Sequence, residues 1–192
     1  MAVVTAVLVM WSDAAGGRAS AAGQSTSDEA QGVQPGADGD LDYIRARTPA
    51  VPVTLADGQV VNLRTLAARK PILLLAVSPT CGACDAVLGR LPEWRPLLPE
   101  VDLRILTSFV PGHPKTTILS EPQSLHDPEN LIRDSIQDWK TPSAVLLGAD
   151  GMLAGGPVTG VEAIEQFVAE VYESLHGVRP EFAGQGRVDT TP

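Results

Sequence analysis

The sequence predicts an α/β domain in which helices flank a central mixed β-sheet that begins with an N-terminal β-hairpin. Three observations support this prediction. Apolar runs of strand length alternate with helical patterns, two Asp-Gly dipeptides mark hairpin turns, and a Cys-X-X-Cys motif separates a strand pattern from a helix pattern. A chain of 192 residues with 44% apolar residues suits one domain of ordinary size with tails.

The two ends of the chain differ in composition from its middle. Residues 1–11 are apolar, but this run is shorter than the roughly 20 residues that a membrane-spanning helix needs. Three interpretations stay open for it: a signal peptide without a positive start, the remnant of a longer membrane anchor, or an apolar end with no targeting role. Residues 12–48 and 177–192 are poor in large apolar side chains, so we expect a flexible linker and a flexible tail. The domain itself is expected over residues 49–176.

The first elements follow from turn chemistry and hydrophobic runs. Val51–Leu55 and Gln59–Leu63 flank Asp57-Gly58, which predicts a β-hairpin. A short helical turn is expected at Thr65–Ala68. The continuous apolar run Pro71–Val77 predicts a strand that is buried on both faces at the centre of the sheet.

The middle of the chain is predicted to form a helix, a strand and an irregular stretch. A helix of about ten residues is expected to start at the cysteine motif, because apolar residues recur there at helical spacing. Pro92 and Pro96 are expected to break or kink the chain beyond that helix. Apolar and charged residues alternate over Val101–Thr107, which predicts a strand. Residues 109–126 contain several Pro and Gly residues and are expected to be irregular.

The last third of the chain predicts a helix, a hairpin and a final helix. Asp127-Pro128-Glu129 combines an N-cap residue, a proline and an acid, so a helix is expected from there to about Gln137. Ser143–Leu147 and Met152–Ala154 are expected to form strands joined at Asp150-Gly151. The final amphipathic helix is predicted from apolar residues at helical spacing: Val161, Ile164, Phe167, Val168, Val171 and Leu175.

The two cysteines, Cys81 and Cys84, lie three positions apart. A disulfide between them would close a loop too short to stabilise the fold, so the pair calls for a chemical explanation. At a helix N-terminus the Cys81 thiolate is favoured by unpaired amides and by the helix dipole. Cys84 lies one turn further on, on the same side, and can reach back. We expect Cys81 to be exposed and to attack a substrate disulfide, and Cys84 to be more buried and to resolve the mixed disulfide.

Two alternatives to redox chemistry are a zinc half-site and a pair of inert buried cysteines. Zinc would need two further ligands, and His113, His126 and His176 do not stand at metal-ligand spacing, so no metal site is predicted. The position of the motif between a strand and a helix favours redox chemistry. A formal net charge of -9, without a run of Lys or Arg, argues against a nucleic-acid surface.

The segment Ile72–Leu91 resembles the active-site region of thioredoxin-like proteins, above all the membrane-anchored TlpA-like and MauD-like thiol–disulfide oxidoreductases. The lead-in Ser78–Cys81 is similar to the MauD-like type. The resemblance includes the hairpin at 51–66 and the segment Thr141–Leu147, and covers roughly Pro49 to Leu175.

This resemblance implies a thioredoxin-like fold and a thiol–disulfide oxidoreductase that acts on protein thiols and disulfides outside the cytoplasm, without a bound cofactor. It also implies a redox partner protein that resets the active site, and a possible N-terminal membrane anchor. Pro142 corresponds to the cis-proline that lies against the cysteines in such proteins. Thr141 would then offer backbone groups to a bound substrate, and Thr80, Gly82 and Ala83 would support the active site.

The sequence also departs from thioredoxins proper. They carry tryptophan where this chain has Thr80 and proline between the cysteines where it has Gly82-Ala83, and many relatives place a buried acid in the strand that here is Pro71–Val77. These departures leave the redox potential and the proton route open. Asp85 is expected to face solvent, and Lys140 either to be solvated or to tune Cys81.

Other candidate residues predict packing or loop roles. Trp94, Trp139 and Phe167 are expected in the core or at its rim, and His126 in a loop. A second function stays open beside the enzyme: a thioredoxin-fold binding or maturation factor that holds a metal or a client cysteine without turnover. Reductant, oxidant and isomerase also remain alternatives.

Overall fold

The computed structural model describes residues 45–116, 122–137, 140–180 and 182. The apolar segment 1–11, Trp139, most of the predicted linker and most of the predicted tail lie outside these residues. Each helix of the described part is too short or too polar to cross a bilayer.

The described residues form a mixed sheet of seven strands in the order β2-β1-β5-β4-β3-β6-β7. The strands are β1 (Pro52–Leu55), β2 (Val60–Asn62), β3 (Ile72–Ala76), β4 (Asp102–Thr107), β5 (Leu125–His126), β6 (Ser143–Leu147) and β7 (Leu153–Thr159). β3 pairs parallel with β4 and antiparallel with β6, which confirms the predicted mixed sheet. The two predicted Asp-Gly hairpins are present as β1–β2 and β6–β7.

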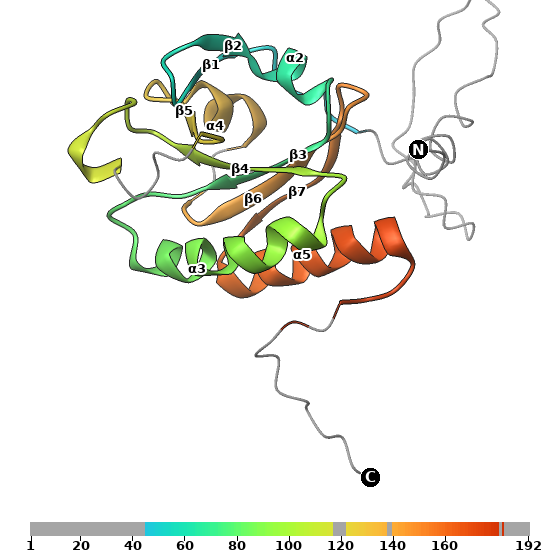
Figure 1. The fold of residues 1–192 in the computed structure, drawn as a ribbon. Coiled ribbons are helices and arrows are strands. Elements are labelled where there is room, and N and C mark those ends of the chain that lie inside the picture. Colours follow the sequence, from blue (N-terminus) through green and yellow to red (C-terminus); the bar gives the residue numbers. More distant parts are fainter. Residues whose placement is uncertain (1–44, 117–121, 138–139, 181, 183–192) are drawn as a thin grey trace, which may run out of the picture. The chain divides into compact units, whose positions relative to one another are not determined.

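Helices cover both faces of this sheet (Figure 1). They are α2 (Leu63–Ala67), α3 (Gly82–Leu97), α4 (Leu131–Ile136) and α5 (Val161–His176), with the short 3-10 helix η1 (Pro114–Thr116). In Figure 1, α3 and α5 lie side by side on one face, while α2 and α4 lie on the other. The core is accordingly divided into two clusters of buried side chains, one on each face.

Strand β3 contributes side chains to both of these clusters. All five of its residues are buried, as the continuous apolar run predicts. Because side chains alternate along a strand, Leu73 and Leu75 pack toward α3 and α5, while Ile72, Leu74 and Ala76 pack on the opposite face. This double burial fixes where β3 ends and hence where the cysteine motif begins.

The stretch 109–126, expected to be irregular, contains strand β5. Its two residues pair antiparallel with β1 and parallel with β4. His126 is therefore a buried strand residue, 1% exposed, and the loop assignment was wrong. A strand this short has no period to detect, because it exists through its pairing partners.

Helix α3 continues through Pro92 and Pro96 to Leu97, well past the predicted length of about ten residues. Each proline removes one amide donor, but Leu91 and Trp94 are buried in the core of this face. Tertiary packing of the buried face therefore outweighs the local preference of the prolines to end the helix.

Helix α4 begins at Leu131 rather than at Asp127. Asp127 still caps it, from a turn upstream: its carboxylate accepts the amides of Leu131 at 2.9 Å and Ile132 at 2.8 Å. Asn130 lies between them at φ 57°, a left-handed conformation that asparagine tolerates. In the last hairpin, the return strand β7 is longer than the predicted Met152–Ala154.

The structured part extends beyond both predicted boundaries. At its start, Arg45 donates from Nε to the carbonyl of Leu153 at 2.8 Å, and Thr48 is fully buried. At its end, Phe182 is 4% exposed within the core cluster of α3 and α5. The guanidinium of Arg90 lies over its ring, 5.8 Å from the centroid. Packed residues are thus present on both sides of the expected domain of 49–176.

Phe182→Ala tests the C-terminal extension of the core. We expect it to lower the free energy of unfolding by about 3 kcal/mol, since it empties a buried aromatic site. Urea denaturation followed by circular dichroism measures this. The matched control is Val178→Ala, because Val178 is 60% exposed in the same segment and should change stability by less than about 0.5 kcal/mol. Equal stabilities for the two variants would contradict the docking of Phe182.

Candidate active site

Cys81 lies at the junction between β3 and α3. It is the N-cap residue of α3, with φ −106° and ψ 108°, and its amide donates to the carbonyl of Ser78 at 3.1 Å. The hydroxyls of Ser78 and Thr80 are 2.9 Å apart and hydrogen-bond to each other, which fixes this turn. The amides of Ala83 and Cys84, in the first turn of α3, lie where they favour the Cys81 thiolate.

The two thiols occupy different environments, and both are reduced. Cys84 is fully buried in the core cluster beneath α3, whereas Cys81 is partly exposed. The amide of Ser78 donates to the Cys84 sulfur at 3.5 Å. The predicted arrangement of an accessible first cysteine and a buried second one is confirmed.

The same environments separate the acidities of the thiols. Burial acts against the thiolate of Cys81, but hydrogen bonds from the Cys84 thiol, the Thr141 side chain and the first amides of α3 outweigh it, so the pKa of Cys81 is lowered. Burial, followed by the hydrogen bond and the charge of Cys81, raises the pKa of Cys84 to about 11. At neutral pH, Cys81 is the group that can ionise and Cys84 keeps its proton.

A second segment, distant in sequence, meets Cys81. The peptide bond between Thr141 and Pro142 is cis, as the resemblance implied. The Thr141 carbonyl lies 3.5 Å from the Cys81 sulfur and accepts its hydrogen bond in the thiol form. The loop is held by Gly160, whose amide donates to the Pro142 carbonyl at 2.9 Å, and by Ser143, whose hydroxyl bonds Thr159 at 2.8 Å.

The fold therefore brings together the predicted cysteines and the Thr141–Pro142 loop. Thr80, Gly82, Ala83 and Thr141 are exposed around the partly exposed sulfur, while Pro142 is buried. Asp85 is exposed, as predicted. Their predicted supporting roles stay predictions, since the geometry places them without testing what they do.

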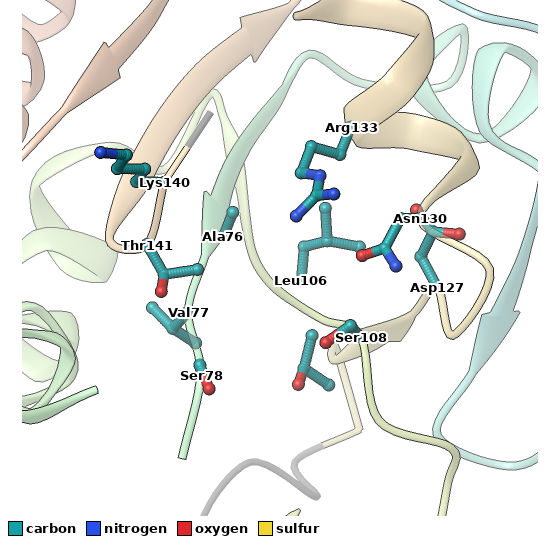
Figure 2. A pocket seen from close by; sticks show the side chains of 11 residues that line it. Ala76, Val77, Ser78, Leu106, Ser108, Asp127, Asn130, Arg133, Lys140 and Thr141 are labelled. Atoms are coloured by element: carbon teal, nitrogen blue, oxygen red, sulfur yellow. The ribbon is translucent and has the colours of Figure 1, made fainter. Parts of the chain in front are cut away.

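A pocket of about 550 Å³ adjoins this site at the carboxyl ends of β3, β4 and β5 (Figure 2). Ser78 and Thr141 belong both to the pocket wall and to the contacts of the cysteines. The full lining is Ala76, Val77, Ser78, Leu106, Thr107, Ser108, Asp127, Asn130, Arg133, Lys140 and Thr141. Sequence reasoning missed the contribution of the α4 region, where the only signal was Asp127 as a helix cap.

Asp127 is a buried acidic residue near the site. Strand β3 itself contains no acidic residue, as noted from its sequence. Burial raises the pKa of Asp127, against the opposing effect of the two amides that its carboxylate accepts. The buried acidic residue next to the site therefore follows β5 and does not lie in β3.

Of the histidines considered as metal ligands, His113 and His126 both contact Phe109, whereas His176 lies beside Glu100. His126 bonds the carbonyl of Phe109 at 2.8 Å, the His113 ring packs at a tilt against the Phe109 ring, and His176 lies 3.7 Å from the Glu100 carboxylate. Within the described ranges no three His, Cys, Asp or Glu side chains gather in a way that could hold a metal ion.

Comparison with known proteins identifies the fold. No protein-family model and no curated protein sequence matches the chain. A Chlorobium tepidum protein proposed to be the thiol:disulfide interchange protein DsbE matches with a TM-score of 0.56 and 15% identity, over 68% of this chain and 96% of its own. A Bacteroides thetaiotaomicron protein proposed to be a protein disulfide isomerase matches with a TM-score of 0.52 and 20% identity, over 69% and 90%. The thioredoxin domain of a Bacteroides vulgatus thiol-disulfide oxidoreductase matches with a TM-score of 0.50 and 14% identity, over 64% and 96%.

Alkylation of the reduced protein tests the asymmetry of the two thiols. We expect iodoacetamide to modify Cys81 first, with a rate that rises at a lower pH than for an ordinary exposed thiol, because the pKa of Cys81 is lowered. Cys84 should react only after denaturation, because it is buried and its pKa is about 11. Mass spectrometry of peptides after timed quenching measures both rates. Equal rates for the two cysteines, or a Cys81 midpoint above that of a free thiol, would show that the site does not activate Cys81.

Proposed function

With the thioredoxin-like fold as the premise, we propose that this protein is a thiol–disulfide oxidoreductase that exchanges disulfides with protein substrates through Cys81 and Cys84. The observation that supports this most directly is the asymmetry of the two thiols. One is accessible with a lowered pKa, and the other is buried and protonated one helical turn away. Such a pair can attack and then resolve in a fixed order.

In the first step the Cys81 thiolate attacks one sulfur of a client disulfide. A bond forms between Cys81 and that sulfur, the client S–S bond breaks, and the other client sulfur leaves as a thiolate that takes a proton from solvent. The amides at the start of α3 favour the attacking anion before this step.

In the second step Cys84 attacks the Cys81 sulfur and releases the second client thiol. Cys84 first gives up its proton to solvent, and the released client thiolate takes up a proton from solvent. Loss of the Cys81 anion helps, because both the hydrogen bond and the charge of Cys81 raise the pKa of Cys84. Two electrons have then passed from the cysteine pair to the client, and a Cys81–Cys84 disulfide remains. A dithiol partner protein restores the reduced pair, and the reverse sequence oxidises a client. No bound cofactor takes part.

The client is proposed to be a polypeptide in extended conformation. Thr141 is exposed beside Cys81, and its backbone can pair with an extended segment whose disulfide lies over the sulfur. The solved structures of similar fold include proteins named for thiol–disulfide chemistry, which supports this class of reaction. The resemblance to TlpA-like and MauD-like proteins supports an extracytoplasmic location with an anchor at the N-terminus.

Single cysteine substitutions test the order of attack. Cys84→Ser should accumulate a mixed disulfide through Cys81 when it is mixed with oxidised insulin, because nothing resolves the intermediate. Cys81→Ser should form no adduct, since the remaining thiol is buried and protonated. Non-reducing electrophoresis with mass spectrometry measures the adducts. An adduct through Cys84 in the Cys81→Ser protein would contradict the assignment.

The direction of exchange follows from the reduction potential of the pair, measured by equilibration with dithiothreitol and glutathione. We expect a value toward the reducing end, about -270 mV, which would identify a reductant; the lowered pKa of Cys81 favours the dithiol state and so limits how reducing the pair can be. A value nearer about -120 mV would instead identify an oxidant. If Cys81 and Cys84 form no disulfide at any redox potential of the buffer, the enzyme proposal is contradicted. The alternative of a binding or maturation factor would then take its place.

A further inference from the structure

The pocket beside the cysteines is lined by polar side chains that have no role in the disulfide exchange itself. Arg133 and Asn130 extend into it from the α4 region, opposite Thr141, and Ser108 lies at its lower end in Figure 2. Thr107 also belongs to the lining. Lys140 also lines the pocket but points away from this space in the same view. The inward-facing groups are therefore a guanidinium, an amide and a hydroxyl, all of which can donate hydrogen bonds.

The acid in this lining, Asp127, does not offset the guanidinium as a free carboxylate would. Both of its oxygens accept backbone amides, from Leu131 and Ile132. Burial also shifts it toward its neutral form. Arg133 already has partners, among them the Asp134 carboxylate at 3.6 Å, but a guanidinium has five donors and can bind a further carboxylate beside them.

We propose that this pocket binds an acidic side chain of the client polypeptide, next to the disulfide that Cys81 attacks, with Arg133 as its charge partner and Asn130 as an additional donor. The inference rests on the proposed function and adds a client preference to it. Arg133 and Asn130 act here as specificity-determining residues and take no part in the thiol chemistry.

The position of the pocket supports a client side chain as its occupant. Ser78 and Thr141 form part of its wall and also contact the sulfurs of Cys84 and Cys81. An extended chain advances about 3.3 Å per residue, so a client bound at Cys81 places neighbouring side chains at the pocket. A volume of about 550 Å³ holds a carboxylate side chain with part of its backbone and some water.

Two disulfide-bonded peptides that differ only in Glu or Gln beside each cysteine test the proposal. The measurement is the second-order rate constant for their reduction by the reduced wild-type protein, in acid-quenched single turnovers. We expect the Glu peptide to react about three- to fivefold faster at low salt, which is the effect of a partly exposed ion pair. The preference should shrink as salt is raised, because the pair is screened.

Substitutions assign this preference to the pocket. Arg133→Gln should bring the Glu:Gln rate ratio close to one, and Arg133→Glu should invert it. Asn130→Gly should lower it partly, since glycine keeps the positive φ of 57° and removes only the amide. Arg69→Gln is the matched control, because Arg69 is exposed just after α2 and should leave the ratio unchanged.

Affinities for non-reactive peptides, in which serine replaces cysteine, separate this inference from the proposed function. Fluorescence anisotropy should show the same Glu preference in the wild-type protein and its loss in Arg133→Gln. Failure to reduce either peptide, with the affinity preference intact, would overturn the enzyme and retain the acid-binding pocket. Equal rates and equal affinities for both peptides, or a preference that Arg133→Gln leaves unchanged, would overturn the pocket assignment and leave the enzyme standing.

Discussion

The burial of β3 on both faces is the constraint on which the site depends. Its five apolar residues pack into two cores, and its two neighbours, β4 and β6, hold it by backbone hydrogen bonds on both edges. Shifting β3 by one residue would exchange the side chains of the two cores. The strand therefore fixes where the chain leaves the sheet, and the turn at Ser78 places Cys81 at the first turn of α3.

That placement makes two identical side chains chemically different. Cys81 lies at the amides of the first turn of α3, whereas Cys84, one turn further along the helix, faces the core. Burial opposes ionisation of both thiols, but only Cys81 gathers enough hydrogen bonds to overcome it. The order of attack that we propose is in this sense a consequence of helix geometry, because one turn of α3 separates the thiol with the lowered pKa from the buried one.

The sequence predicted the elements that carry a local signal and missed those that depend on partners. The double burial of β3, the hairpin turns and the cysteine pair could be read from runs, Asp-Gly dipeptides and spacing. Strand β5 could not, because two residues have no period and its place is set by β1 and β4. Pro92 and Pro96 misled in the opposite way, since their local preference is real but weaker than the packing of Trp94.

In the candidate site, too, the residues with a local sequence signal were predicted and those placed by distant partners were not. The cysteines follow from the motif, and the cis peptide before Pro142 follows from the resemblance to thioredoxin-like proteins. The pocket does not, because Ser108, Asn130 and Arg133 come from separate loops and a helix that no short motif connects. The position of these residues depends on β5, the strand that was not predicted from the sequence. Asp127 directly follows β5 and caps α4, and so places Asn130 and Arg133 beside the pocket. The proposed reaction thus depends on a contiguous motif, whereas the proposed choice of client depends on distant segments that are brought together by pairing in the sheet.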